Sequence, residues 1–278
     1  MLNASQARKH QAFRDLHTRD GSFVIPNPWN GGTAMILEQL GFEALATTSA
    51  GFAFNAGRQD SAEDLSGEMV LENAREIVEA TALPVSADLE GGFGDTPEAC
   101  AETIRQACAV GLVGGSIEDA TGRPEDPIFS FELPVDRIQA AVAAAKDLPF
   151  LLTARAENYL YGRPDLADTI RRLQAFSEAG AEVLYAPGLP DLETIRTLCR
   201  EVDRPVNVVM GLSGPNFSVA ELQDAGVKRI SVGGAFARAA LGAFIRAARE
   251  VQEIGTFGYA ADAIPDSEVR TFFQRQVC

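Results

Sequence analysis

The sequence contains very few of the residues that bind soft metals or act as nucleophiles. Its 278 residues include 2 histidines and 4 cysteines. Both histidines, His10 and His17, lie in the first segment, "MLNASQARKHQAFRDLHTRD". Neither a histidine metal cluster nor a serine–histidine–aspartate triad is therefore predicted. The cysteines show no CxxC spacing, which excludes the common zinc motifs and favours inert thiols in a reducing cytoplasm, the compartment we expect.

Long apolar runs and an excess of positive charge are also missing. No run reaches the roughly 20 residues that a membrane span requires, and the first segment is polar rather than signal-like. The net charge of −15 argues against nucleic acid or an anionic membrane surface as a partner. A small anionic substrate stays compatible with this charge, because local cations or a metal ion can outweigh it.

Strand and helix patterns alternate along the chain with short connections. Eight apolar runs, each followed by a helical pattern, are predicted to be strands: "SFVIPN", "FEALATTS", "LPVSADLE", "LVGGSIED", "LPFLLTARAE", "AEVLYAPG", "RPVNVVMG" and "VKRISVGG". Continuous apolar runs are typical of strands that are covered on both faces. A doubly wound sheet has the same alternation, but eight units in about 250 residues favour an α/β fold of the (β/α)8 TIM barrel type.

We predict a single barrel domain over residues 1–278, with an N-terminal helix over 1–20 and a C-terminal helical tail from about 235. Thr96 followed by Pro97 predicts the start of a helix. The segment "AGFAFNAGRQDSAEDLS" after the second strand is predicted to be irregular.

Charged residues gather where the predicted strands end, which is where barrel active sites lie. Asp88 and Glu90 end the third strand and share a face because they are two residues apart. The next two strands end in Glu118 and Asp119 and in Arg155 and Glu157. Any one acidic residue at a strand end can equally cap a helix or face solvent, but the repetition on three neighbouring strands favours a common site.

Carboxylates that converge without histidine or thiolate form a site for a hard cation, Mg²⁺ or Mn²⁺. The predicted metal ligands are Asp88, Glu90 and Glu118. Arg155 is the cation suited to a bidentate grip on a substrate carboxylate. The glycines of "EGGFG" would allow close approach of backbone and ligand.

Three segments, "SADLEGGFGD", "GGSIEDATGRPEDP" and "LLTARAENYLYGR", in this order and spacing, resemble the isocitrate lyase/phosphoenolpyruvate mutase superfamily. The resemblance implies an enzyme that binds a 2-oxo acid or its enolate through Mg²⁺. It places Ser49 and Gly51 at the substrate carboxylate and carbonyl, and Asp60 at the aspartate of the following loop. The resulting candidates are Arg155, Asp60 and Glu118 for catalysis, and Ser49, Ala50, Gly51, Arg155 and Asn207 for substrate binding.

The sequence departs from the family pattern in three ways. Glu90 replaces the second aspartate of "DAD". The loop "ATGRPEDPIFSFEL" has neither the cysteine nor the histidine of the "KxCGH" segment, which argues against a true isocitrate lyase. The "K…NS" segment and the histidine after the sixth strand, both typical of the phosphonate enzymes, are also missing, and "YAPG" with Pro187 stands at the latter place.

The leading hypothesis is a Mg²⁺-dependent lyase that breaks a bond to C3 of an oxaloacetate-like acid, with water, Tyr159 or Asp60 moving the proton. The alternatives are a phosphonopyruvate-type hydrolase or mutase, an aldol-type transferase, and a barrel that binds a 2-oxo acid without turnover. The resemblance also implies that the loop 120–133, with Arg123, closes over substrate. It further implies a homodimer or homotetramer in which the helix "AFARAALGAFIRAAREV" is swapped between subunits.

Overall fold

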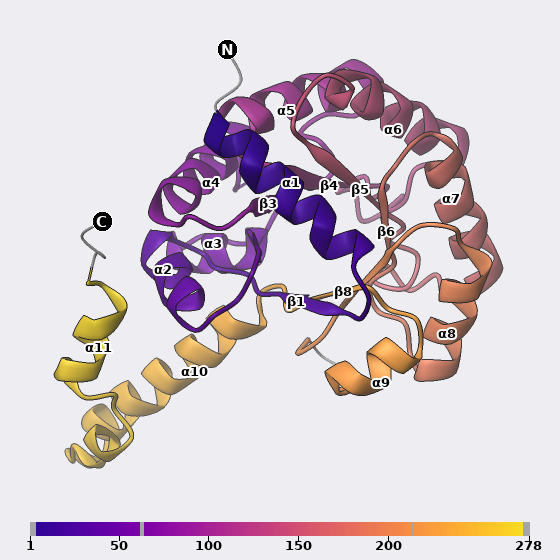
Figure 1. Ribbon diagram of the computed structural model, residues 1–278. Coiled ribbons are helices and arrows are strands. Elements are labelled where there is room, and N and C mark those ends of the chain that lie inside the picture. Colours follow the sequence, from indigo (N-terminus) through magenta and orange to yellow (C-terminus); the bar gives the residue numbers. More distant parts are fainter. Residues whose placement is uncertain (1–3, 62–63, 213, 275–278) are drawn as a thin grey trace.

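The computed structural model describes residues 4–61, 64–212 and 214–274. Eight strands form one parallel sheet in the order β1-β8-β7-β6-β5-β4-β3-β2. Their bounds are β1 Phe23–Ile25, β2 Leu45–Ala46, β3 Val85–Asp88, β4 Gly114–Glu118, β5 Leu151–Arg155, β6 Val183–Tyr185, β7 Val206–Val209 and β8 Arg229–Ser231. The strands surround a common centre with helices outside them (Figure 1), so the predicted (β/α)8 barrel is confirmed.

Residues at or just beyond the ends of β1 and β2 close the barrel. Ala46 N–H donates to the Pro26 carbonyl at 3.0 Å. The buried Asn27 side chain then joins three strand ends: its Nδ2 donates to Thr47 O, and its Oδ1 accepts from the N–H groups of Val232 and Gly233, each at 2.9 Å. One polar side chain therefore replaces ladder hydrogen bonds where β1 and β2 meet β8, which keeps these buried backbone groups paired.

The outer helices follow the strands in chain order. They are α2 Gly31–Gln39, α3 Ser49–Asn55, α4 Gly67–Ala80, α5 Pro97–Ala109, α6 Glu132–Ala145, α7 Leu166–Glu178, α8 Leu192–Glu201 and α9 Val219–Asp224. Thr96 caps α5 through Ala99 N–H, with Pro97 at its first turn, as predicted. The expectation of an irregular segment after β2 was wrong in its first part, because Thr48 caps the short helix α3 there.

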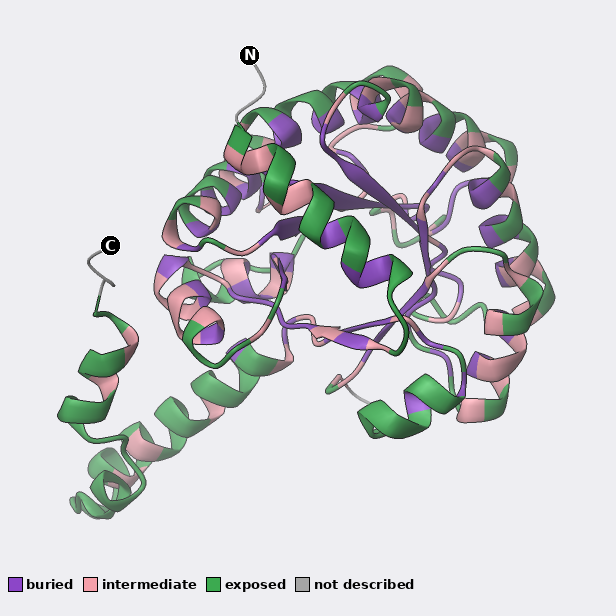
Figure 2. Cartoon of the chain, in the orientation of Figure 1, coloured by how far each residue is buried: buried purple, intermediate pink, exposed green. Residues whose placement is uncertain are grey.

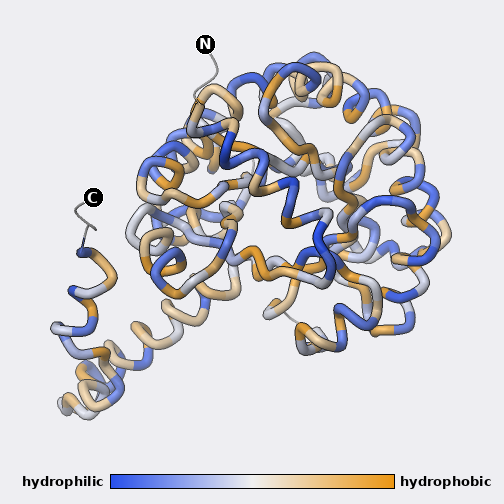
Figure 3. The backbone as a smooth tube through the Cα atoms, viewed as in Figure 1, coloured by the Kyte–Doolittle hydropathy of each residue, from blue (hydrophilic) through white to orange (hydrophobic). Residues whose placement is uncertain are grey.

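Helix α1, Ala4–Thr18, lies across the amino-terminal opening of the barrel (Figure 1). Its Phe13 and Leu16 pack against strand residues such as Phe23 and Val183 in one buried cluster. The main core lies between the strands and the outer helices. Alternation of hydrophobic and hydrophilic residues along the outer helices is visible in Figure 3 and is typical of helices with one buried face.

The carboxyl-terminal segment leaves the barrel. Helix α10, Ala235–Arg249, continues through a π-helical turn, Glu250–Ile254, into a short helix, Gly258–Ala261, and α11, Asp266–Phe272. Figures 1 and 2 show α10 projecting away from the barrel and exposed over most of its length, with α11 returning beside α2. Within the described chain, no helix has the length and apolar character needed to cross a bilayer.

Candidate active site

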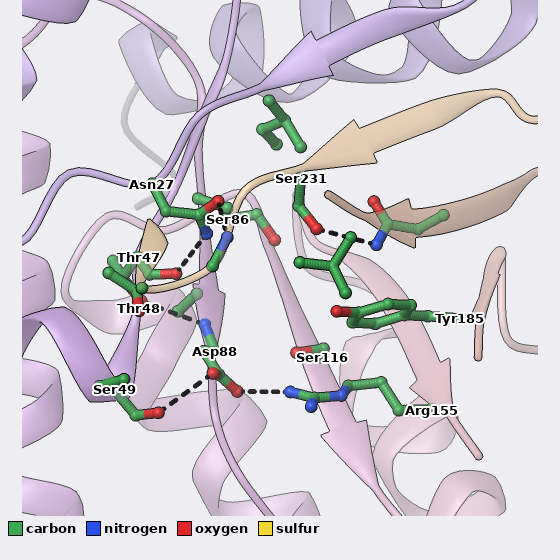
Figure 4. Close-up of a pocket in the computed structure, with 18 of the residues that line it drawn as sticks. Asn27, Thr47, Thr48, Ser49, Ser86, Asp88, Ser116, Arg155, Tyr185 and Ser231 are labelled. Carbon is green, nitrogen blue, oxygen red and sulfur yellow. Dashed lines mark hydrogen bonds and ion pairs between the residues drawn. The ribbon is translucent and has the colours of Figure 1, made fainter. Parts of the chain in front are cut away.

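A cavity of about 260 Å³ opens at the carboxyl ends of the strands, as expected for a barrel enzyme. It is lined by six of the predicted site residues: Ser49, Ala50, Asp60, Asp88, Arg155 and Asn207. Residues from α3, β3, β5 and β7 are thus brought into one space, although Ser49 and Asn207 are 158 positions apart in the sequence. Figure 4 shows Asp88, Ser49 and Arg155 pointing toward one another.

Arg155 lies at the centre of the carboxylate group. Its Nη1 is 2.9 Å from Asp88 Oδ1, its Nη2 is 3.1 Å from Glu118 Oε2, and its Nε is 2.9 Å from Glu157 Oε1. The guanidinium also lies over the Tyr185 ring, 4.9 Å from the centroid. Burial lowers the pKa of Arg155, but the facing carboxylates outweigh burial and hold that pKa well above its ordinary range.

The carboxylates around Arg155 outnumber it. Burial raises the pKa of Glu118, and Arg155 only partly offsets this while Glu157 and Asp88 add repulsion. Burial likewise raises the pKa of Glu157 and, together with the charges of Asp88 and Glu118, that of Glu90. A second cation in this group would relieve the repulsion.

The donor set therefore fits a hard divalent cation in its chemistry: all of the donors are carboxylate oxygens and negative charge is in excess. Among the described residues, no three acidic, histidine or cysteine side chains are arranged as a ready-made metal cage. Mg²⁺ does not need one, because it usually keeps several waters and is bound through one or two carboxylates plus substrate oxygens.

A second cavity, of about 620 Å³, lies on the other side of the carboxylate group, under the loop after β4. It is lined by Glu90 and Glu118, and it shares Asp60 with the first cavity. Burial and the charge of Asp88 raise the pKa of Asp60, whereas the hydroxyl of Ser49 lowers it. Asp60 is thus a lining residue of both cavities.

The turn "EGGFG" after β3 is held in an unusual conformation. Glu90 and Phe93 have positive φ angles of 50° and 53°, which non-glycine residues rarely adopt. The buried Arg137 of α6 donates to the carbonyls of Gly91 and Gly94 and lies over the Phe129 ring, 4.4 Å from its centroid. Arg137 therefore holds the backbone that aims the Glu90 carboxylate.

Some of the remaining predicted residues line the cavity, and others pack behind it. Ser49 Oγ donates to Asp88 Oδ2 at 3.3 Å. Gly51 does not line the cavity: its N–H donates to Thr48 Oγ1, and a Cβ there would approach Thr48 Cγ2 to 2.6 Å, so the glycine is needed for packing. Asp119 is fully buried and points away, accepting from Glu157 N–H at 2.8 Å and from Arg172 Nη1 at 3.0 Å.

The loop expected to close over substrate is ordered by its own hydrogen bonds. Ala120 and Ile128 form an antiparallel bridge, and Thr121 N–H donates to Pro127 O. Arg123 is partly exposed and pairs with Asp95 at 2.8 Å.

Several cavity residues were not predicted from the sequence. They are Thr47, Ser86, Ser116, Tyr185, Arg229 and Ser231. Their signal was available in the strands: Ser86 precedes Asp88 by two residues and Ser116 precedes Glu118 by two, so each serine shares the inward face of its acidic neighbour.

Comparison with known proteins supplies the family. The family model for phosphoenolpyruvate phosphomutase matches residues 13–252. The 2-methylisocitrate lyase of Escherichia coli K12 is 31% identical over 225 residues, covering 78% of this chain and 75% of that protein. A solved structure from Burkholderia cenocepacia J2315, described only as a lyase/mutase, is 55% identical with a TM-score of 0.95, covering 99% of this chain and 98% of that one.

A more distant solved structure shows the same fold. It is a phosphonopyruvate hydrolase in complex with oxalate and Mg²⁺, 24% identical with a TM-score of 0.84, and it covers 95% of this chain and 94% of its own. The match over most of the barrel, together with the 31% identity to a curated lyase, confirms the superfamily recognised in the sequence motifs. The chain belongs to the phosphoenolpyruvate phosphomutase family of the isocitrate lyase/phosphoenolpyruvate mutase superfamily, a group of lyases and mutases.

Proposed function

We propose that this enzyme is a Mg²⁺-dependent lyase that breaks a bond to C3 of a small 2-oxo acid, with decarboxylation of an oxaloacetate-like acid as its leading activity. The observation that carries the proposal is the arrangement of three carboxylates around Arg155 at the mouth of a small polar cavity. This arrangement combines a carboxylate-binding cation with oxygen ligands for a metal.

Arg155 is the proposed substrate-binding group. Its Nε bond to Glu157 sets the plane of the guanidinium, and Glu157 is in turn tied through its N–H to Asp119. The two Nη atoms, which now face Asp88 and Glu118, are the donors that would bind a substrate carboxylate. Such a preorganised cation stabilises negative charge as it develops on the substrate.

Asp88, Glu90 and Glu118 are the residues that would hold Mg²⁺, directly or through water. When bound, the ion acts as a Lewis acid toward the 2-oxo group and orients the substrate. The phosphonopyruvate hydrolase of the same fold was solved in complex with oxalate and Mg²⁺, which supports the choice of ion.

Proton delivery is assigned to Asp60. It lines both cavities, beside Ser49 and Asp88, whereas Tyr159 does not line the space around Arg155. The loop after β4 contains no thiol or imidazole. The site therefore has no counterpart of the cysteine and histidine found in the "KxCGH" segment of the isocitrate lyases. Loss of CO₂ leaves only a carbanion to protonate, which a carboxylic acid or a water can do.

The test is incubation of the purified protein with oxaloacetate and Mg²⁺, with and without EDTA, while pyruvate is measured against the metal-only background. We expect turnover that EDTA abolishes and that Asp88→Ala lowers by a factor of at least about 100. Glu43→Ala, which removes a carboxylate paired with Arg19 on the surface, is the matched control.

Product analysis separates the alternatives. Inorganic phosphate from phosphonopyruvate would indicate the hydrolase, and a longer acid from an added aldehyde would indicate the aldol-type transferase. Binding of 2-oxo acids without any product would indicate a binding barrel and would contradict the proposal.

A further inference from the structure

The cavity does not end at the carboxylate group but reaches into the barrel. Arg155, Tyr185, Asn207 and Arg229 are register partners on four adjacent strands, β5 to β8. All four line the same cavity. Barrel interiors are usually filled by branched apolar side chains, so a polar row that begins and ends in an arginine calls for a ligand-based explanation.

Arg229 lies at the inner end of this row, at the start of β8, and is 5% exposed. Its neighbours are neutral: Nε donates to Asn207 Oδ1 at 2.8 Å and Nη2 donates to Thr153 Oγ1 at 3.0 Å. Nη1 is 3.5 Å from His17 Nε2 of α1, the helix that covers this end of the barrel.

His17 cannot supply a negative charge, and its geometry makes it a neutral acceptor. Its Nδ1 lies 2.8 Å from the Phe13 carbonyl oxygen. Because a carbonyl only accepts, Nδ1 must carry the proton, and Nε2 presents its lone pair toward Arg229. Burial, followed by the charge of Arg229, lowers the pKa of His17 to about 3.

Arg229 therefore differs from Arg155 and Arg172, whereas the buried Arg137 also has no ion pair with a carboxylate among the described residues but donates to the carbonyls of Gly91 and Gly94. Arg155 has three carboxylate partners, and Arg172 pairs with Asp119 and Asp168. Within residues 4–61, 64–212 and 214–274, no ion pair joins Arg229 to a carboxylate. Burial lowers the pKa of Arg229 to about 10, which leaves the guanidinium charged at neutral pH. A buried charge without a counter-ion is costly.

We propose that the inner part of the cavity is an anion subsite in which Arg229 binds a small carboxylate. Asn207, Tyr185 and Ser231 place amide and hydroxyl groups around the same space. The volume of about 260 Å³ suits an acid of a few carbons, since drug-sized ligands occupy roughly 300 Å³ or more.

Two kinds of ligand have a carboxylate that fits this subsite. One is the distal carboxylate of a 2-oxo diacid whose 2-oxo end lies at Arg155, and this source rests on the proposed function. The other is a free carboxylate such as formate, which requires no catalytic activity.

The experiment compares pyruvate with 2-oxoglutarate by titration calorimetry in the presence of Mg²⁺. The two acids share the 2-oxo acid end and differ by a distal carboxylate, and 2-oxoglutarate has no carboxylate at C3 to lose. Formate is titrated separately in a thermal-shift assay at constant ionic strength. Each measurement is made on the wild type, Arg229→Gln, Arg229→Lys, Arg123→Ala, which removes the arginine of the loop expected to close over substrate, and the control Arg105→Ala, which removes an exposed arginine of α5 paired with Glu102.

If the distal carboxylate occupies the subsite, R229Q raises the Kd for 2-oxoglutarate by roughly tenfold or more and changes the Kd for pyruvate by less than about twofold. Only the diacid loses a charge-assisted hydrogen bond. R229K then restores part of the affinity, and R105A leaves it unchanged. If a free carboxylate occupies the subsite, formate raises the melting temperature of the wild type saturably and has no such effect on R229Q.

The proposal is overturned if R229Q changes neither the affinity ratio of the two acids nor the response to formate, since water alone would then fill the inner cavity. Loss of diacid affinity in R123A but not in R229Q would overturn it as well. If R229Q does not fold, R229K replaces it in each measurement. The wild type is then also titrated with formate in the presence of saturating pyruvate. Failure of the wild type to bind either 2-oxo acid would contradict the proposed function, while the formate titration would still test Arg229.

Discussion

Arg155 Nη1 and Asp88 Oδ1 lie 2.9 Å apart, across strand β4, which separates their own strands β5 and β3. The pair is largely buried, with side-chain exposures of 11% and 22%. Because Glu118 of β4 also contacts the guanidinium, three adjacent strands are joined at one cation. The same contacts serve the stability of the barrel rim and the proposed chemistry, and substitutions can separate these roles.

Removing Arg155 should lower both the stability of the fold and the proposed activity. Arg155→Ala leaves Asp88, Glu118 and Glu157 buried without their cation, and we expect it to lower the free energy of unfolding by about 3–5 kcal/mol. Arg155→Lys keeps a charge but cannot bond three carboxylates in one plane, so its loss should be smaller. Urea denaturation at pH 7 measures both. An R155A protein as stable as the wild type would show that the carboxylates are already protonated or solvated.

Ser49→Ala tests the contact with Asp88. The 3.3 Å hydrogen bond is long, so its loss should change the free energy of unfolding by less than about 1 kcal/mol. If the hydroxyl also contacts substrate, kcat/KM for oxaloacetate should fall by about tenfold. Steady-state kinetics and urea denaturation on the same preparation separate these effects. An unchanged kcat/KM would remove Ser49 from the proposed site.

Asp168 provides a stability prediction with a defined pH range. Burial raises its pKa, but hydrogen bonds from Arg172, Arg171 and Asn158 outweigh burial and lower it to about 2. A depressed carboxyl pKa stabilises the fold above the unfolded value of 3.8, and this stabilisation is lost as the pH falls from about 4 to 2.

Asp168→Asn should therefore cost about 1 kcal/mol at pH 7, after allowance for solvent screening, and the difference from the wild type should shrink as the pH falls below about 4. Denaturation curves across this range check it. Glu193→Gln, which breaks an exposed pair with Arg196, is the control and should cost less than about 0.5 kcal/mol. A difference that grows on acidification would contradict the sign.

The carboxyl-terminal helices give a prediction about assembly. Phe244, Ile254 and Phe257 are 70%, 71% and 65% exposed on the segment that projects from the barrel. Figure 3 shows hydrophobic residues on this projecting segment. Exposed apolar surface of this kind is typical of a protein–protein contact, and we propose that it packs on a second copy of the chain, as a homodimer or homotetramer.

Light scattering should accordingly give a mass of at least two chains at micromolar concentration. Phe244→Glu with Ile254→Glu should shift the mass toward that of one chain, whereas Leu40→Glu, at an exposed leucine on the barrel itself, should not. A monomeric wild type would contradict the proposal.

The sequence predicted the barrel because its evidence is local. Near-continuous apolar strands, glycines that end helices and the Thr96–Pro97 start signal each act over a few residues. The carboxylate cluster was predictable for a related reason: strand ends in a parallel barrel meet at one rim, so Asp88, Glu118 and Arg155 were expected to converge. Helix α3 was missed because "AGFAFNAG" is short and contains glycines at both ends.

Other features depended on the tertiary structure. The sequence by itself determined the strand–helix order, the charged rim and the family motifs, since each is written in residue type and spacing. Only the folded chain decided that Arg155 contacts three carboxylates and that Gly51 packs against Thr48 rather than lining the cavity. It also decided that Arg229 lines the cavity and has no ion pair with a carboxylate among the described residues. These depend on the stagger of strands far apart in the sequence, which sets the partners that each inward side chain meets.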